Sequence, residues 1–175
     1  IPINLSTTHV DFFTSSLYKW CFASHGTGVS IVSENLLHKL TPLSAGVFSQ
    51  TDRAMLSTPY LPTSTAKKFE YGNLNTFGII CAHESFKWFN SLGGAQVIHP
   101  LLTHMSQGII NLLKDKGYML AVNYDANHAS GIVSFIHPNP TDFMERLTQA
   151  GGMATHRDGF IRLSPGIYQS DETLT

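Results

Sequence analysis

The sequence predicts a mixed α/β protein whose second half forms a small α/β sandwich. Strand-like and helix-like patterns alternate after residue 95, and the connections between them are short. An apolar stripe at helical spacing runs through residues 98–116. The chain has 175 residues, which is enough to bury a core in one modest domain or in pieces of two.

The first predicted elements are short. Residues 9–15 are rich in apolar side chains, and residues 27–33 carry the β-branched residues that are typical of a strand. Ser33 is a suitable N-cap for a short helix over residues 34–40, which Pro42 ends. We therefore expect a strand followed directly by a helix.

The connection over residues 41–73 is mostly loop and carries a small basic patch at Lys67 and Lys68. A connection this long inside a domain is usually functional or mobile.

A longer helix is predicted from about residue 75, with Gly93 and Gly94 as its stop signal. One face of this helix gathers the apolar residues Phe77, Cys81, Trp88 and Leu92. Glu84 falls on the same face, and we interpret it as one half of an ion pair with a neighbouring element rather than as a catalytic carboxylate.

The strongest predicted helix covers residues 98–116, where Pro100 fits only the first turn and Gly117 marks the C-terminal end. Its apolar stripe consists of Ile98, Leu101, Leu102, Met105, Ile109, Leu112 and Leu113.

Strands are predicted after this helix, over residues 118–122, 131–136 and 159–164. Between the last two, Asn139 caps a helix that Pro140 opens.

Composition limits the class of partner. The net charge is −1 at pH 7, so the charge balance gives no sign of a nucleic acid or a membrane surface as partner. No apolar run is long enough to span a bilayer, and no signal-peptide pattern follows Ile1. Cys21 and Cys81 form no CxxC pair, and we expect both to be reduced and buried in a cytoplasmic protein.

Lys19 stands between two aromatic residues, Tyr18 and Trp20, in the stretch TSSLYKWCFASHGTG. One interpretation is that its stem packs along the aromatic rings while the ammonium stays in water. The other is covalent catalysis, because a lysine in an apolar pocket loses its proton more easily and can form a Schiff base with a carbonyl.

The surroundings of Lys19 suit the second interpretation. Ser15, Ser16 and Tyr18 supply hydroxyl donors for an anionic group, and the glycines at 26 and 28 let the backbone approach a ligand. His25, in the turn after Lys19, is the histidine we expect to face the site.

Four segments in order carry a recognisable pattern. The first is Asp-Phe-x-x-x-Ser-x-Tyr-Lys-Trp followed by Gly-x-Gly and a strand. The others are FEYGNLNTFGI (69–79), ASGIVSF (129–135) and RDGFIRLSPGIYQSDE (157–172). These segments resemble the class V aminotransferases, which are fold type I enzymes dependent on pyridoxal 5′-phosphate (PLP). Together they extend over nearly the whole chain and favour the catalytic interpretation of Lys19. The family includes cysteine desulfurases, kynureninases, isopenicillin-epimerase-like proteins and carbon–sulfur lyases.

The resemblance implies an α/β fold that is part of the PLP-dependent transferase fold type I. Residues 1–94 would be the C-terminal part of the PLP-binding large domain, and residues 95–175 the small C-terminal domain without its last helix. In the family the ring-binding aspartate, the stacking aromatic residue and the main phosphate loop precede the lysine. We therefore expect this sequence to be a C-terminal fragment, as its lack of an initiator methionine also indicates.

The resemblance also assigns roles to individual residues. Lys19 matches the lysine that carries PLP as a Schiff base and moves protons at the substrate's α-carbon. Ser16 and Tyr18 match residues that contact the cofactor phosphate. Asn73 stands where many members have a threonine that reaches the phosphate of the neighbouring subunit, which implies a homodimer with a shared active site. Arg162 matches the arginine that binds the α-carboxylate of an amino-acid substrate.

The expected function is therefore PLP-dependent chemistry on an amino acid, as transamination, carbon–sulfur lysis or epimerisation. Tyr18 slightly favours an alternative, a kynureninase-like hydrolase, and a third hypothesis is a non-catalytic fragment that only pairs with a partner chain. No cysteine follows residue 153, where desulfurases carry theirs, so persulfide chemistry is not expected. We interpret Arg157 as structural, and His99 and His104 as residues that bind no metal. The sequence leaves open which amino acid is used and which bond is broken.

Overall fold

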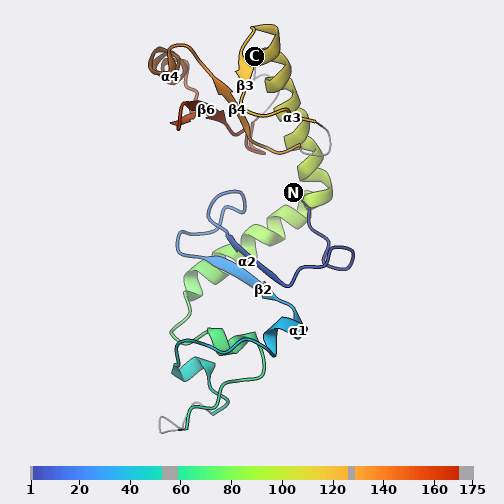
Figure 1. Ribbon diagram of the computed structural model, residues 1–175, viewed down its shortest axis with the longest axis vertical. Helices are drawn as coiled ribbons and strands as arrows, with labels where there is room; N and C mark the ends of the chain where they lie inside the picture. Colours follow the sequence, from blue (N-terminus) through green and yellow to red (C-terminus); the bar gives the residue numbers. More distant parts are fainter. Residues whose placement is uncertain (1, 53–58, 126–128, 170–175) are drawn as a thin grey trace. The chain divides into compact units, whose positions relative to one another are not determined.

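The computed structural model describes residues 2–52, 59–125 and 129–169 (Figure 1). The chain divides into two compact units, one over Ile3–Trp88 and a second that begins at Phe89. No helix in the described ranges combines the length and the apolar character that a bilayer span requires.

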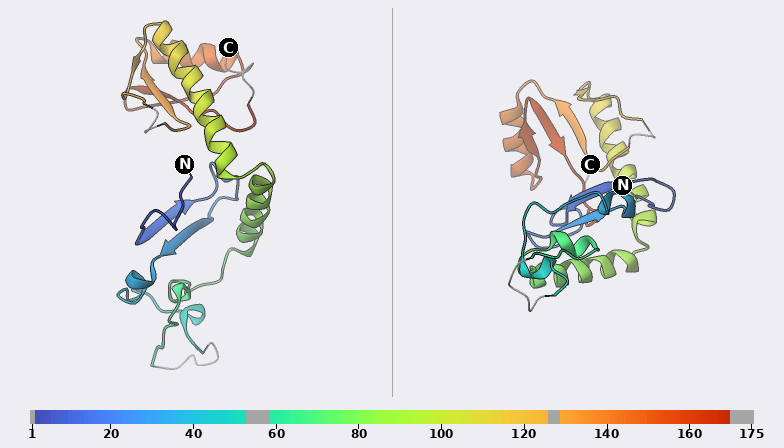
Figure 2. Two further views of the ribbon diagram at one scale, coloured as in Figure 1. Left: turned by 90° about the vertical axis from the view of Figure 1, so that its right-hand side faces the viewer. Right: turned by 60° about the horizontal axis from the view of Figure 1, so that its bottom comes forward.

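The first unit opens with an antiparallel pair of strands, β1 (Phe12–Ser16) and β2 (Gly28–Val32). The two strands lie side by side (Figure 2). In their register, Phe12 lies opposite Val32 and Ser16 lies opposite Gly28. The strand expected over residues 27–33 is therefore confirmed, and β1 occupies part of the apolar-rich stretch that precedes it.

Helix α1 (Glu34–Leu37) follows β2 and begins as predicted, because the Ser33 hydroxyl accepts a hydrogen bond from the Leu36 backbone N–H. The helix ends earlier than expected. Beyond it, the backbone N–H groups of Lys39 and Leu40 both bond to the Leu36 carbonyl, which turns the chain.

Lys68 does not belong to a surface basic patch, so that prediction is wrong for this residue. It lies in the short 3₁₀ helix η2 (Ala66–Phe69) and is 7% exposed. Its ammonium donates to the carbonyl oxygens of Leu37 and Leu40, at 2.5 and 2.7 Å. The last carbonyls of a helix have no partner within the helix and carry partial negative charge, so a lysine is a favourable cap there.

The rest of the described connection between α1 and α2 is largely irregular, as expected. It contains a second 3₁₀ helix, η1 (Val47–Ser49), and an isolated bridge between Gln50 and Pro62. Ser49 is fully buried, and its hydroxyl bonds to Tyr60 Oη at 2.9 Å.

Helix α2 (Thr76–Ser91) ends as predicted, because Gly93 and Gly94 adopt the positive φ angles of 93° and 66°. The expected apolar face is not its buried face. Phe77 is 71% exposed, whereas the buried residues of α2 are Gly78 and Ala82. The side chains of Thr27 and Asn75 lie against Gly78, and Ala82 packs with Leu17 and Ala23.

Glu84 of α2 forms an ion pair, but its partner lies in the same helix. Lys87 Nζ is 3.0 Å from a Glu84 carboxylate oxygen, and both side chains are exposed. The expectation of an ion pair with a neighbouring element is therefore wrong.

The second unit contains a four-stranded antiparallel sheet in the order β3-β4-β6-β5. Its strands are β3 (Met119–Leu120), β4 (Val133–Ile136), β5 (Thr155–Arg157) and β6 (Phe160–Leu163). Three of these confirm the predicted strands, each shorter than expected. The edge strand β5 was not predicted, because its three residues are polar and exposed.

Helices α3 (Ala95–Asp115) and α4 (Pro140–Gln149) cover one face of this sheet (Figure 2). The core combines Ile109, Ile110, Leu113, Val133, Phe135 and Ile161 with the partly buried Phe143 and Met144. The arrangement is the small α/β sandwich that the sequence predicts.

The details of α3 and α4 agree with the sequence in part. Gly117 ends α3 with a φ of 77°, and the Asn139 side-chain oxygen caps α4 by accepting from the Asp142 N–H at 3.3 Å. Of the predicted α3 stripe, Leu101 and Leu112 are 43% and 41% exposed. Pro100 lies inside α3 rather than in its first turn, because the helix begins before residue 98.

Candidate active site

Lys19 lies in a loop that connects β1 to β2, and we call residues 17–27 the lysine loop. The buried side chain of Leu17 packs with Ala23 and Ala82. The Leu17 N–H donates to the Thr27 carbonyl, and the Ala23 N–H donates to the Leu17 carbonyl, both at 3.0 Å. Leu17 thus fixes both ends of the loop that presents Lys19.

The side chain of Lys19 is exposed. Its ammonium lies 5.5 Å from the centroid of the Tyr18 ring. The sequence suggested that Tyr18 and Trp20 enclose the lysine in an apolar pocket. They do not, because they are themselves 37% and 40% exposed. They are adjacent residues in a turn, and they leave the amine open to a ligand.

Tyr18 is in contact with His25 from the far side of the lysine loop. The two rings stack with centroids 4.6 Å apart and an interplanar angle of 27°. Gly26, which follows, has a φ of 76°, a conformation that favours glycine. The structure therefore places His25 beside Tyr18 of the lysine loop.

Ser16 is exposed at the end of β1, two residues before Tyr18. It lies opposite Gly28, where an added Cβ would come within 3.0 Å of the Ser15 carbonyl oxygen. Gly28 therefore serves the close pairing of the two strands, which is a different role from the approach to a ligand that the sequence suggested.

Asn73 is exposed and belongs to the same unit as Lys19. Two residues later, the side-chain oxygen of Asn75 accepts from the Gly78 N–H at 3.0 Å, and its amide nitrogen donates to Thr27 Oγ1 at 3.4 Å. The structure thus brings the segment of Asn73 to the lysine loop. Sequence reasoning missed Asn75, although an asparagine before a helix is an N-cap signal.

Arg162 lies in the second unit, at the centre of the sheet. In the strand register it stands between Ser134 of β4 and Thr155 of β5, on the face opposite the buried Ile161. A hydroxyl side chain therefore flanks the guanidinium on each neighbouring strand, since paired residues share a face.

The arginines of the described chain differ in their partners. Arg146 lies 3.8 Å from Asp142, and Arg157 lies 3.2 Å from Asp158. Within the described ranges, Arg162 has no carboxylate partner, so its exposed guanidinium is available to a carboxylate ligand.

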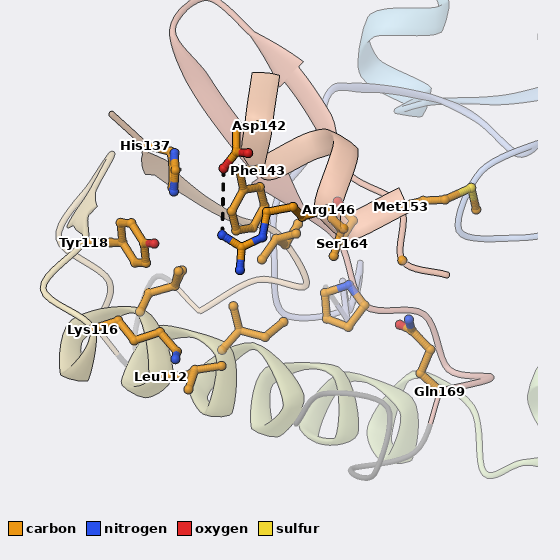
Figure 3. Close-up of a pocket in the computed structure, with 16 residues that line it drawn as sticks. Leu112, Lys116, Tyr118, His137, Asp142, Phe143, Arg146, Met153, Ser164 and Gln169 are labelled. Carbon is orange, nitrogen blue, oxygen red and sulfur yellow. Dashed lines mark ion pairs between the residues drawn. The ribbon is translucent and has the colours of Figure 1, made fainter. Parts of the chain in front are cut away.

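A cavity of about 510 Å³ lies in the second unit, between α3 and α4 (Figure 3). Its polar lining includes Lys116, Tyr118, His137 and Arg146. Leu163 lines it too, which places the cavity on the sheet face opposite Arg162. None of the predicted site residues lines this cavity, and we do not assign it to the candidate site.

Cys21 is part of the lysine loop and partly buried. Burial raises the pKa of the Cys21 thiol above its ordinary value, so the side chain stays protonated and packs with Leu17 and Ala82. Both cysteines are free thiols.

The donors of the first unit suit an anionic ligand that carries a carbonyl. The hydroxyls of Ser16 and Tyr18, the amide of Asn73 and the amine of Lys19 are all exposed, and none of these groups is a carboxylate that would repel an anion. Hydroxyl and amide donors hold a phosphate, and an exposed amine reacts with an aldehyde. The side chains present therefore fit PLP.

Comparison with known proteins supports this fit. The family profile described as aminotransferase class-V matches residues 1–161. No curated protein matches the sequence. Among solved structures, an apo cysteine desulfurase from Thermococcus onnurineus NA1 superposes with a TM-score of 0.86 at 21% identity, over 98% of this chain and 46% of that chain.

Two structures of C-DES are also similar. The complex of this cystine C–S lyase with its product cysteine persulfide has a TM-score of 0.86 at 18% identity, over 99% of this chain and 46% of that chain. A C-DES mutant with glycine covalently linked to its PLP cofactor has a TM-score of 0.79 at 18% identity, with the same coverage. The fold is that of the type I PLP-dependent enzymes, and the chain spans about half the length of the structures it matches.

Proposed function

The chain belongs to the class V aminotransferase family, and from this premise we propose that it carries part of the PLP site of an enzyme that acts on an amino acid. The single observation that carries the proposal is the exposed amine of Lys19, which directly follows the exposed hydroxyl side chains of Ser16 and Tyr18. A similar fold binds PLP in C-DES, which supports the choice of cofactor.

Lys19 is the proposed attachment point of the cofactor. Its Nζ would hold the cofactor through a covalent bond to the aldehyde carbon of PLP. When bound, PLP withdraws electrons from the α-carbon of an amino acid. The Lys19 amine would accept and return a proton at that carbon.

Ser16 and Tyr18 are the proposed donors to the cofactor phosphate. Their side chains lie on either side of the buried Leu17, so the loop that carries Lys19 also carries the phosphate donors. Asn73 is proposed to donate an amide N–H to the phosphate of a second copy, which makes the enzyme a homodimer with a shared active site.

Arg162 is proposed to bind the α-carboxylate of the substrate. A guanidinium meets a carboxylate with two parallel hydrogen bonds, and no described carboxylate occupies Arg162. We also propose that residues 1–94 belong to the large domain and residues 95–175 to the small domain.

The reaction is proposed to be transamination, carbon–sulfur lysis or epimerisation. Persulfide formation on a cysteine is not part of the proposal, because residues 154–165 contain no cysteine. Tyr18 favours a kynureninase-like hydrolase as a second candidate, and turnover of an aryl-keto amino acid would support it. The free thiols of Cys21 and Cys81 support a cytoplasmic location.

Replacement of Lys19 tests the proposal in the protein as its source makes it. Lys19→Ala should lower amino-acid turnover by more than about a hundredfold and leave PLP bound only non-covalently. Lys39→Ala, at an exposed lysine of the same unit, should change neither. Near-normal turnover of Lys19→Ala would contradict the assignment, and absence of PLP from the unaltered protein would favour a chain that only pairs with a partner.

A further inference from the structure

The Tyr18 ring lies next to two groups that bear on the proposed cofactor site. His25 stacks on it at a centroid distance of 4.6 Å, and Lys19 Nζ lies 5.5 Å from its centroid. The orientation of one aromatic ring is therefore linked both to an imidazole and to the proposed attachment point of PLP.

Backbone geometry brings His25 back to Tyr18. Gly26 turns the chain with a φ of 76°, and the Thr27 carbonyl then accepts from the Leu17 N–H at 3.0 Å. Ser24 Oγ and Thr27 Oγ1 lie 3.1 Å apart, which closes the same turn with a side-chain hydrogen bond. The position of His25 is thus set by the loop itself.

We propose that His25 is a positioning residue that holds the Tyr18 ring in place beside Lys19. The proposal rests on the proposed function of Lys19 and adds a residue to it. Tyr18 is 37% exposed, and among the described residues His25 is the one whose ring stacks on it. Without this contact the Tyr18 ring gains rotamer freedom, and its hydroxyl is no longer held ready for the phosphate.

Two variants separate this role from direct contact between His25 and the phosphate. His25→Phe keeps an aromatic ring for stacking and removes both nitrogens, whereas His25→Ala removes the ring as well. An aromatic pair contributes enough that His25→Ala should raise the dissociation constant of PLP roughly two- to tenfold. His25→Phe should remain within about twofold of the unaltered protein.

The experiment uses the protein as its source makes it, freed of PLP and titrated with PLP. The bound fraction is followed by visible absorbance, and the covalent fraction by borohydride reduction. A second readout is the chemical shifts of the Tyr18 ring protons in the PLP-free protein. The effect of the stacked ring on these shifts should be lost in His25→Ala and retained in His25→Phe. His38→Ala, at an exposed histidine of the same unit, is the control and should change neither readout.

The outcomes are distinct. Equal PLP affinity in His25→Ala and the unaltered protein overturns the role of His25, and so does an affinity in His25→Phe as low as in His25→Ala. If the unaltered protein takes no borohydride label at Lys19, the proposed function itself fails, and the role of His25 falls with it.

Discussion

Asn75 joins the first turn of α2 to Thr27 of the lysine loop. Its amide nitrogen lies 3.4 Å from Thr27 Oγ1, while its side-chain oxygen accepts from the Gly78 N–H. A Cβ added at Gly78 would come within 2.0 Å of Thr27 Oγ1 and 2.5 Å of Asn75 Nδ2. The contact between the lysine loop and the segment that carries Asn73 therefore requires a glycine at position 78.

Gly78→Ala should therefore destabilise the protein. The overpacked junction lowers the free energy of unfolding by about 1–3 kcal/mol, measured by chemical denaturation. Gly108→Ala is the matched control in α3, because an added Cβ there meets nothing within 4 Å. It should raise the free energy of unfolding by up to about 1 kcal/mol through helix propensity. Equal effects of the two substitutions would rule out the close approach at Gly78.

Lys68→Met should loosen the end of α1. The substitution keeps much of the side-chain volume but leaves the carbonyls of Leu37 and Leu40 without their donor. Loss of the donor to these partly buried carbonyls should cost up to about 1–3 kcal/mol, and amide hydrogen exchange should accelerate around α1. Lys67→Met, at the exposed neighbouring lysine, should stay within about 0.5 kcal/mol of the unaltered protein. Similar losses in both variants would contradict the capping role.

Arg162→Ala should mainly raise KM for the amino-acid substrate. Loss of two charge-assisted hydrogen bonds to a carboxylate predicts a rise of roughly ten- to a hundredfold, measured by steady-state kinetics. Arg157→Ala is the control, since Arg157 already pairs with Asp158. An unchanged KM in Arg162→Ala would remove Arg162 from the substrate site.

Cys21 should make stability depend on alkaline pH. Burial raises the pKa of its thiol in the folded chain above the ordinary value of 9.0, so the folded chain holds the proton more tightly than the unfolded chain. This contribution is complete below pH 9.0 and is lost as the pH rises through the raised pKa. The thermal midpoint of Cys21→Ala should therefore fall less than that of the unaltered protein between about pH 8 and about pH 11. An equal fall of the thermal midpoint with pH in both proteins would contradict this prediction.

Local signals made most of the fold predictable from the sequence. Ser33, Asn139, Gly93 and Gly117 mark helix ends through conformations that depend on the neighbouring residues alone. Strand β5 was missed because three polar residues have no apolar alternation. The Asp158-Gly159 pair, with φ values of 53° and 81°, is the turn signal that would have revealed the hairpin.

Contacts between distant segments were not predictable. The burial of Lys68 depends on α1, which lies some thirty positions earlier in the chain. The exposed Phe77 and the buried Gly78 reverse the expected face of α2, because a helical stripe records which residues are apolar and not which segment packs against them.

For the candidate site, the sequence supplied candidate residues and no geometry. Lys19, Ser16, Tyr18, Asn73 and Arg162 were named from short motifs, and their functional roles remain proposals. The stacking of His25 on Tyr18 and the bridge from Asn75 to Thr27 depend on the folded loop, and no sequence pattern specifies these contacts.

The most direct measurement is a borohydride trap on the protein as its source makes it, saturated with PLP. Reduction converts the carbon–nitrogen double bond between cofactor and lysine into a stable single bond, and peptide mass spectrometry locates the label. We predict a pyridoxyl group on the peptide that holds Lys19 and its absence from the same peptide in Lys19→Ala. A label on another lysine, or none in a PLP-saturated sample, would contradict the account and return Lys19 to the role of an exposed lysine packed along aromatic rings.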